Sequence, residues 1–313
     1  MIGTEIEKAR ELLLQNEVVA IPTETVYGLA GNALSAVAVS KIFEAKNRPH
    51  FDPLIVHVSS ISEVSKYVEE IPELVFNLME HFWPGPLTVL LPKKKCIPDL
   101  TTSGLNEVGI RIPNHVTTLE LLKSLPFPLA APSANPFGYI SPTSAAHVEA
   151  QLGEKIPYIL NGGNCSVGIE STVLRVQNNE IEILRLGGIS MEDLLPFTSK
   201  IHIQQYSSSS PASPGMLTNH YAPRKPIYVG NIREMMHSFS SQKIGVLSFK
   251  EDFQMESQRI LSKTGNFTEA ASNLFSYMRE LDQMNIDVIL AEYLPKENLG
   301  RAINDKLKRA SAK

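Results

Sequence analysis

Short apolar runs alternate along this chain with longer segments in which apolar residues recur every three or four positions. The short runs have the length of buried β-strands, and the longer segments have the spacing of amphipathic helices. Before residue 207 we predict strands at residues 18–21, 54–58, 87–91, 108–112, 126–131, 158–160, 171–173 and 181–186. The helices predicted there span residues 4–16, 35–45, 61–68, 72–82 and 141–152.

A change of composition divides the chain near residue 207. Residues 207–214 read SSSSPASP, a serine- and proline-rich stretch that cannot build a hydrophobic core. We therefore predict a first domain over 1–206, a linker over 207–225 and a smaller domain over 226–313. In the last of these, we predict strands at 227–229, 243–248 and 288–291 and helices at 268–285 and 299–309. Alternating strands and helices are typical of an α/β domain with a parallel sheet.

Polar side chains directly follow several of the predicted strands. Pro22 stops the first strand, and the hydroxyls and carboxylate of Thr23, Glu24 and Thr25 come next. In open α/β sheets, ligands bind beyond the ends of the strands. Because guanidinium groups and hydroxyls suit phosphate and carboxylate, we predict a pocket for a polyanionic ligand. The cations and hydroxyls on which this prediction rests are Lys46, Arg48, Arg111 and Arg185, with Thr25, Ser133, Ser141 and Ser171.

Two of these residues allow more than one interpretation. Arg111 interrupts an apolar strand, and a buried charge needs a partner, so either a ligand or a protein carboxylate must meet it. Ser141 precedes a predicted helix and can act as its N-cap. The N-terminus of a helix also attracts anions, so capping and ligand binding are compatible there.

Composition limits the partners of the chain. With 43% apolar residues the 313-residue chain can build ordinary cores, and a net charge of -4 argues against general binding of polyanions. The lysine run at 93–95 is expected to be a solvated loop, with contact to RNA as the alternative. The N-terminus does not resemble a signal peptide, and no apolar run has membrane-spanning length. We therefore expect a soluble, cytoplasmic protein without a membrane partner.

Several familiar chemical motifs are absent from the sequence. It contains no P-loop, no G-x-G-x-x-G and no G-x-S-x-G, which argues against P-loop, dinucleotide-binding and α/β-hydrolase sites. Cys96 and Cys165 lack metal-ligand spacing and are expected to be free thiols. No protein metal site is predicted, although Mg²⁺ held mainly by phosphates would leave no motif.

Ordered motifs along nearly the whole chain carry a family resemblance. PTETVYGLA at 22–30, KNRP at 46–49 and PLIVH at 53–57 are similar to the pattern of the Sua5/YrdC family, the threonylcarbamoyl-adenylate synthases. Further matches are APSAN at 131–135, ISPT at 140–143, GIESTV at 168–173, LRLGGI at 184–189, SPGMLTNHYAP at 213–223 and GRAINDKL at 300–307. The last two resemble the longer, Sua5-type members. Asn47 and Lys306 depart from the family pattern, which often has glycine and arginine at these places.

The resemblance implies a fold and a reaction. The fold is an α/β one: a twisted, open, mixed YrdC-like sheet with helices around a concave pocket, followed by a smaller Rossmann-like α/β domain. Family members condense L-threonine, bicarbonate or CO2, and ATP into threonylcarbamoyl-AMP and pyrophosphate. This reaction is that of a nucleotidyltransferase. Its product serves the N6-threonylcarbamoyl modification of adenosine 37 in ANN-reading tRNAs, which a tRNA threonylcarbamoyltransferase complex carries out.

Site residues are implied by motif position. The residues expected around L-threonine are Thr25, His57, Arg111, Ala131 and Ser171. The residues expected around ATP, which would carry Mg²⁺, are Arg48, Asp52, Ser133, Ser141, Arg185 and Tyr221. Lys46 and Arg48 are the expected catalytic cations near the phosphates.

Other functions remain open at this level. The linker can be passive or can fold over the pocket as a lid that carries Tyr221. A module that binds tRNA or another RNA without turnover is the main alternative to the synthase, although basic and aromatic residues are not interleaved here. A carbamoyl transferase of the hydrogenase-maturation type is a third interpretation. The smaller domain suggests no chemistry of its own, because Glu292, Asn304 and Asp305 can be ordinary loop and cap residues.

Overall fold

A mixed sheet of eleven strands forms the first part of the computed structural model, which describes residues 1–204 and 220–312. Its strand order is β1-β8-β2-β3-β7-β4-β6-β5-β9-β10-β11. Neighbours run parallel in some pairs, such as β4 and β6, and antiparallel in others, such as β2 and β3. The strands are β1 (Ile2–Gly3), β2 (Val19–Ile21), β3 (Gly28–Asn32), β4 (Ile55–His57), β5 (Leu87–Pro92), β6 (Glu107–Arg111), β7 (Leu129–Ala130), β8 (Tyr158–Leu160), β9 (Thr172–Gln177), β10 (Glu180–Arg185) and β11 (Ile201–Ile203).

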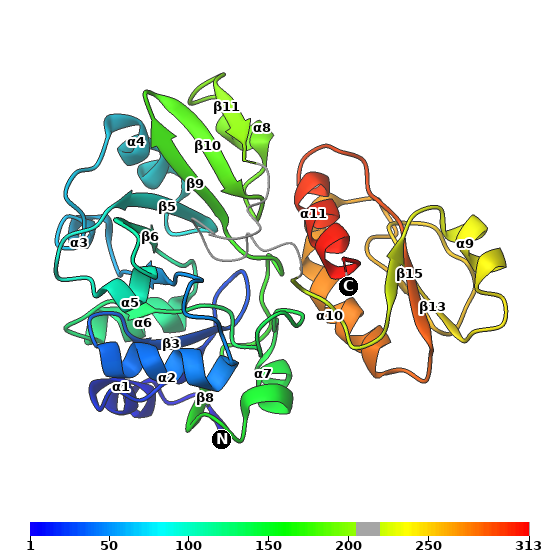
Figure 1. Cartoon of the computed structure of the whole chain (residues 1–313), viewed down its shortest axis with the longest axis horizontal. Coiled ribbons are helices and arrows are strands. Elements are labelled where there is room, and N and C mark those ends of the chain that lie inside the picture. Colours follow the sequence, from blue (N-terminus) through cyan, green and yellow to red (C-terminus); the bar gives the residue numbers. More distant parts are fainter. Residues whose placement is uncertain (205–219, 313) are drawn as a thin grey trace.

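Helices lie around this sheet (Figure 1). They are α1 (Ile6–Leu14), α2 (Ala36–Lys46), α3 (Ile61–Val64), α4 (Glu73–Phe82), α5 (Asp99–Thr102), α6 (Val116–Ser124), α7 (Ala145–Leu152) and α8 (Met191–Leu194). Helix α2 shows how the sequence sets such boundaries. Ser35 caps its first turn by accepting a hydrogen bond from the Ala38 amide, and Asn47 ends it in the left-handed conformation at φ 51°. Ile42 and Phe43 of α2 are buried in the core, and this packing fixes the position of Arg48 just beyond the end of the helix.

The structure corrects two predicted helices and adds a strand in the first part. The helix predicted at 141–152 begins at Ala145, because Ser144 and not Ser141 caps it, through the His147 amide. The helix predicted at 61–68 is one turn, α3. Strand β3 was not predicted, because Gly28 and Gly31 read as bends. The glycine at 28 permits close packing instead, since a Cβ atom there would lie 3.2 Å from the Ala131 Cβ.

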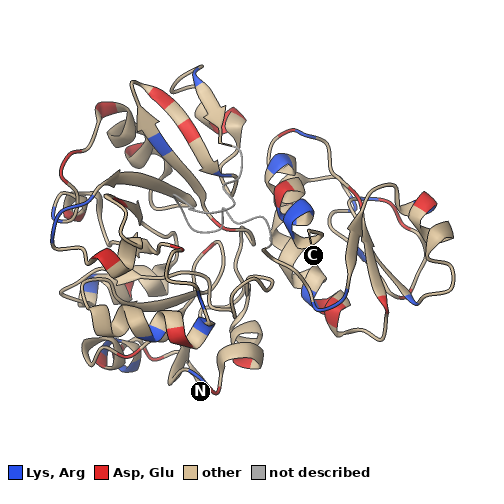
Figure 2. Cartoon of the chain, in the orientation of Figure 1, with Lys and Arg blue, Asp and Glu red and all other residues tan. Residues whose placement is uncertain are grey.

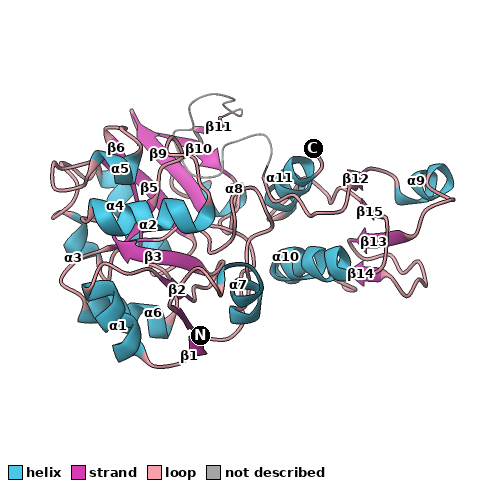
Figure 3. Ribbon diagram, turned by 60° about the horizontal axis from the view of Figure 1, so that its bottom comes forward, coloured by secondary structure: helices cyan, strands magenta, loops and turns pink. Residues whose placement is uncertain are grey.

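The second part is a parallel, four-stranded sheet with the order β12-β15-β13-β14. Its elements are β12 (Ile227–Val229), α9 (Ile232–Ser238), β13 (Ile244–Ser248), β14 (Gln258–Ile260), α10 (Phe267–Gln283), β15 (Val288–Ala291) and α11 (Gly300–Ala310). Figures 1 and 3 show α10 and α11 on the side of this sheet that faces the first part, with α9 on the other side. The predicted α/β class, a large mixed sheet and a smaller parallel one, is confirmed.

One hydrophobic cluster spans both parts. It joins Val26, Ile140 and Tyr221 to Phe275 and Ile303, which belong to α10 and α11. Most of the predicted linker, 207–219, lies outside the described residues, and its last described part begins at His220. Figure 2 shows cationic and acidic residues interspersed over both parts. Within 1–204 and 220–312, no helix has the length and apolar character needed to cross a bilayer.

Candidate active site

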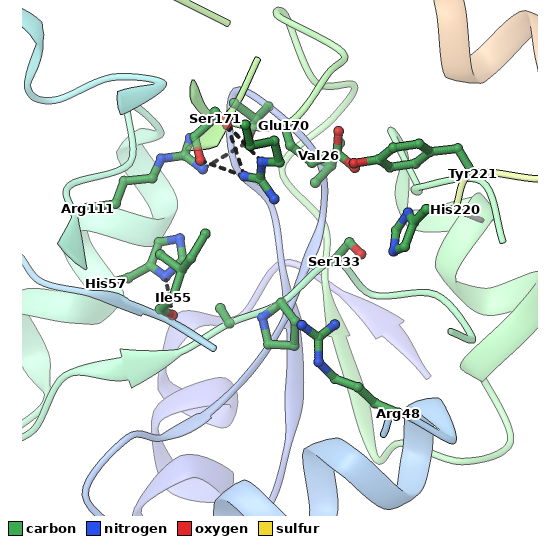
Figure 4. A pocket seen from close by; sticks show the side chains of 14 residues that line it. Val26, Arg48, Ile55, His57, Arg111, Ser133, Glu170, Ser171, His220 and Tyr221 are labelled. Atoms are coloured by element: carbon green, nitrogen blue, oxygen red, sulfur yellow. Dashed lines mark hydrogen bonds between the residues drawn. The ribbon is translucent and has the colours of Figure 1, made fainter. Parts of the chain in front are cut away.

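One pocket gathers most of the predicted site residues (Figure 4). It lies where β4, β6 and β10 end and where the loops after β2, β7 and β8 approach them. Its lining residues are Thr25, Val26, Arg48, Ile55, His57, Arg111, Ala131, Pro132, Ser133, Glu170, Ser171, Arg185, His220 and Tyr221. The expectation that strand ends would bring cations and hydroxyls together therefore agrees with the geometry.

Arg111 has a protein carboxylate as its partner. Its Nη2 lies 2.7 Å from Glu24 Oε1, Nη1 donates to Thr25 Oγ1 at 3.0 Å, and Nε donates to the Gly85 carbonyl at 3.2 Å. The sequence left open whether Arg111 meets a ligand or a protein carboxylate, and the structure shows the protein carboxylate of Glu24. The guanidinium still lines the pocket, so a ligand that carries a carboxylate can approach it as well.

His57 is a neutral neighbour of this ion pair. It ends β4 and pairs in register with Arg111 of the parallel strand β6. Its Nδ1 lies 3.3 Å from the Ile55 carbonyl. Burial, followed by the positive charge of Arg111, lowers the pKa of His57 to about 3, so the imidazole is uncharged at neutral pH. It can take part in hydrogen bonds without adding charge.

Arg185 and Ser171 form a hydrogen-bonded pair in the pocket lining. The antiparallel pair β9 and β10 brings the start of one strand next to the end of the other. Arg185 Nη2 donates to the Ser171 carbonyl at 2.9 Å and to Ser171 Oγ at 3.0 Å. Ser171 Oγ also lies 2.7 Å from Thr88 Oγ1. These contacts fix both the guanidinium and the hydroxyl.

Arg48 enters the pocket from the end of α2. Its Nε donates to the Asp52 carbonyl at 3.0 Å, and its Nη2 donates to the Pro53 carbonyl at 2.9 Å and lies 2.8 Å from Asp52 Oδ2. Burial raises the pKa of Asp52, and the positive charge of Arg48 opposes this. Figure 4 shows the guanidinium of Arg48 directed into the pocket. The contacts with Asp52 and Pro53 thus hold the guanidinium of Arg48 where an anionic ligand can meet it.

Three predicted site residues stand behind the pocket wall instead of lining it. Lys46 Nζ donates to the Ser133 carbonyl at 2.5 Å and to the Asn135 carbonyl at 2.6 Å, so its ammonium holds this loop. Asp52 is fully buried against Arg48. Ser141 Oγ donates to Glu170 Oε1 at 2.6 Å. In this geometry they support residues that do line the pocket.

Several lining residues were not predicted. Glu170 directly precedes Ser171 within GIESTV, and its Oε2 is buried without a hydrogen-bond partner among the described residues. His220 precedes Tyr221, and their rings meet edge to face with centroids 4.2 Å apart. Motif position could have found both, because each is the immediate neighbour of a predicted residue. Val26, Ile55 and Pro132 add apolar surface and left no separate signal.

The buried imidazole and phenol of His220 and Tyr221 are uncharged. Burial, followed by the positive charge of Arg309, lowers the pKa of His220 well below its usual value. Burial is also the main reason why the pKa of Tyr221 is raised. Among the described residues, the Tyr221 hydroxyl has no hydrogen-bond partner, so it is available to a ligand.

Within the same described residues, no three His, Cys, Asp or Glu side chains gather to hold a metal ion.

Comparison with known proteins matches both parts of the chain. Residues 11–187 match the family model described as telomere recombination, which covers Sua5, YciO and YrdC proteins. Residues 180–312 match the C-terminal domain of threonylcarbamoyl-AMP synthase. The threonylcarbamoyl-AMP synthase of Bacillus subtilis is 39% identical over 324 residues, which cover 98% of this chain and 93% of the relative.

Solved structures agree with these matches. The crystal structure of Pyrococcus abyssi Sua5 complexed with L-threonine superposes with a TM-score of 0.93 at 36% identity, covering 99% of this chain and 97% of that one. A full-length HypF structure in a phosphate- and nucleotide-bound form matches with a TM-score of 0.51 at 25% identity, covering 59% of this chain and 29% of that one. The chain therefore belongs to the Sua5/YciO/YrdC family and carries the C-terminal domain of the threonylcarbamoyl-AMP synthases.

Proposed function

We propose that this chain is a threonylcarbamoyl-AMP synthase, which condenses L-threonine, bicarbonate or CO2, and ATP into L-threonylcarbamoyladenylate and pyrophosphate. One observation carries the proposal: a single pocket holds two chemically different halves. Arg111 and His57 lie on one side of the pocket, and Arg48 and Tyr221 lie toward the other (Figure 4). Ser171 and Arg185 are hydrogen-bonded to each other and join the two halves. The full-length relatives bear the name of this activity.

The first half suits a small amino acid. Arg111 offers a fixed guanidinium for the threonine carboxylate, and Thr25 and Ser171 offer hydroxyls beside it. His57 is uncharged and accepts or donates a hydrogen bond without repelling the substrate's amine. Ala131, which lines the same pocket, leaves room for the methyl group of threonine.

The second half suits a triphosphate. Arg48 and Arg185 are buried cations whose orientation is fixed by backbone carbonyls. Ser133 adds a hydroxyl, and Tyr221 lines the same pocket with its phenol. Fixed cations stabilise charge that develops on phosphate without any reorganisation at the moment of reaction. Lys46 and Asp52 would act on this half indirectly, through the Ser133 loop and Arg48.

The reaction needs no covalent nucleophile from the protein. The neutral amine of threonine adds to CO2 and loses one proton, which gives a carbamate. A carbamate oxygen then forms a bond to the α-phosphorus of ATP while the bond to the bridging oxygen breaks, and pyrophosphate leaves. The pocket contributes by holding the carbamate and the α-phosphate together and by neutralising charge with Arg48 and Arg185.

ATP would bring Mg²⁺ into this pocket. Glu170 fits such an ion, because its Oε2 is buried, lines the pocket and has no hydrogen-bond partner among the described residues. When bound, the ion would neutralise charge on the phosphates, and Glu170 would supply one oxygen to it. The remaining oxygens would come from the phosphates and water.

The product also defines the cellular role that we propose. L-threonylcarbamoyladenylate is an activated acyl adenylate, so a second enzyme, a tRNA threonylcarbamoyltransferase complex, would transfer the threonylcarbamoyl group to adenosine 37 of ANN-reading tRNAs. We propose that the protein acts in the cytoplasm as one step of this tRNA modification, and that any direct contact with RNA is secondary to catalysis. Positive and negative residues are interspersed in Figure 2, and this pattern argues against RNA binding as the main role.

Pyrophosphate release from ATP by the purified protein tests the proposal. We expect release only when L-threonine and bicarbonate are both present, and a threonylcarbamoyl adenylate in the mass spectrum. ATP that stays intact under every combination would overturn the proposal and favour salt-sensitive RNA binding without turnover. Turnover that requires carbamoyl phosphate in place of bicarbonate would instead indicate a carbamoyl transferase of the hydrogenase-maturation type.

A further inference from the structure

The smaller domain contacts the nucleotide half of the pocket through a fully buried lysine. Lys306 lies on α11, yet its Nζ donates to the Leu186 carbonyl of the first part at 2.6 Å. Leu186 directly follows Arg185, which lines the pocket. The same ammonium lies 3.3 Å from Asp305 Oδ2. A cation withdrawn from water in this way needs such partners, and here one of them is the backbone carbonyl of the residue next to Arg185.

Tyr221 is held by the same domain. The ammonium of Lys306 lies 5.3 Å from the centroid of the Tyr221 ring, and the guanidinium carbon of Arg309 lies 4.9 Å from it. The ring of Phe275, on α10, stacks on Tyr221 with centroids 5.3 Å apart. Tyr221 also has a φ of 66°, a left-handed conformation that costs a non-glycine residue about 1 kcal/mol or more. Such a conformation persists where its surroundings hold it.

A second buried cation makes a similar tie. Arg279, on α10, donates from Nε to the Ser141 carbonyl at 3.2 Å and from Nη2 to the Ile140 carbonyl. Ser141 in turn donates from Oγ to Glu170, which lines the pocket. Helices α10 and α11 therefore each contact Tyr221, which lines the pocket, and each also binds a backbone carbonyl close to another lining residue.

We propose that the smaller domain positions the nucleotide half of the pocket, and that Lys306 is its main positioning residue. Through the Leu186 carbonyl it fixes the end of β10 that carries Arg185, and through the ring of Tyr221 it fixes a residue that lines the site. The inference rests on the proposed function, because Arg185 and Tyr221 are assigned to ATP there. Burial lowers the pKa of Lys306, while Asp305 and Glu170 oppose this shift and favour the charged form.

Another contact between the two parts offers a matched control. Arg301 lies on the same helix, and its Nη1 is 2.5 Å from Glu192 Oε1 of α8, at a place that does not line the pocket. Arg301→Met and Lys306→Met each remove one cation of α11 that bridges the two parts. If the domain only holds the molecule together, the two variants should behave alike. If it positions the site, only Lys306→Met should alter catalysis.

The test compares Lys306→Met, Lys306→Arg and Arg301→Met with the wild type by steady-state pyrophosphate release and by thermal unfolding. We expect Lys306→Met to raise the KM for ATP roughly tenfold or more, as for loss of one hydrogen bond to a charged group, with the KM for threonine within about twofold. Lys306→Arg should restore most of the ATP affinity, and Arg301→Met should leave both constants unchanged.

Several outcomes separate this inference from the proposed function. If the wild type releases no pyrophosphate, the proposed function fails. If the wild type is active and Lys306→Met has the kinetic constants of Arg301→Met, the positioning role is wrong. Equal increases in both KM values would also overturn it. Should Lys306→Met not fold, Phe275→Leu removes the ring stacked on Tyr221 and keeps an apolar side chain, and it must raise the KM for ATP selectively.

Discussion

Arg111 and Glu24 form an ion pair inside the pocket wall, with 2.7 Å between Nη2 and Oε1 and only 5% of each side chain exposed. The positive charge that we assign to the threonine carboxylate is therefore already compensated before any substrate binds. Removal of one member of such a pair leaves the other charge buried alone, which costs far more than the pair contributes. The two members must consequently be tested together.

We expect Arg111→Met to lower the free energy of unfolding by about 3–5 kcal/mol, because Glu24 would remain buried without its partner. Binding of L-threonine should be lost in the same variant, since its carboxylate would meet no cation. Urea unfolding measures the first effect, and isothermal titration with threonine measures the second.

The double variant Arg111→Met, Glu24→Gln separates stability from binding. Because it carries no unpaired charge at this place, most of the lost stability should return. Threonine binding should stay absent. A double variant that binds threonine as tightly as the wild type would show that Arg111 does not meet the substrate carboxylate.

Arg111 also illustrates what a sequence can predict. A charge inside an apolar strand demands a partner, and Thr25, His57 and Ser171 reach the same pocket because they stand at strand ends. The pattern could not tell a carboxylate from a ligand, because Glu24 lies more than eighty residues away and only the pairing of strands brings it near.

Contacts of lysine and glutamate were the hardest to predict. A lysine at the end of a helix can reach phosphates or carbonyls, and only the path of the 133–135 loop decides that Lys46 meets carbonyls. Glu170 was missed although it directly precedes the predicted Ser171, because the prediction around Ser171 rested on hydroxyls and cations. The contacts of Lys306 depend on how the two parts of the chain pack against each other, which no local pattern encodes.

Lys46 should act mainly on stability. Lys46→Met would leave the Ser133 and Asn135 carbonyls without this donor, at about 1–3 kcal/mol for each buried group. We expect a lower free energy of unfolding and a moderate increase in the KM for ATP as the Ser133 loop loosens. A turnover defect as large as that of an Arg48 variant, with unchanged stability, would instead support direct contact of Lys46 with the phosphates.

Arg48 should act mainly on turnover. Lysine at this place keeps the charge but cannot hold the Asp52 and Pro53 carbonyls and still present a planar guanidinium to a phosphate. We expect Arg48→Lys to lower kcat on the order of 10²-fold, similar to the loss of one donor to a transition-state oxyanion. Arg10→Lys, at an exposed ion pair with Glu7, serves as the control and should be as active as the wild type. Wild-type turnover in Arg48→Lys would refute the assignment.

Two buried histidines, His57 and His220, and the half-buried His147 predict how stability depends on pH. Burial is the main cause that lowers the pKa of His57 to about 3 and of His147 to about 4, and the pKa of His220 lies well below its usual value. Unfolded histidine titrates near 6.5, so below this pH the unfolded chain binds protons that the folded chain excludes. The stabilisation is complete above 6.5 and is lost as the pH falls toward the folded pKa values.

The size of this effect follows from linkage. Each fully buried histidine should lower the free energy of unfolding by about 2 kcal/mol between pH 7 and pH 5. Asp52 acts in the opposite direction, because burial raises its pKa and the folded state then takes up its proton first. A comparison of variants isolates the histidine: urea unfolding of His57→Asn should show a pH slope shallower by about 1.4 kcal/mol per unit below pH 6. Equal slopes in the variant and the wild type would mean that His57 becomes protonated in the folded protein. The threonine site could then no longer be described as containing a neutral imidazole beside Arg111.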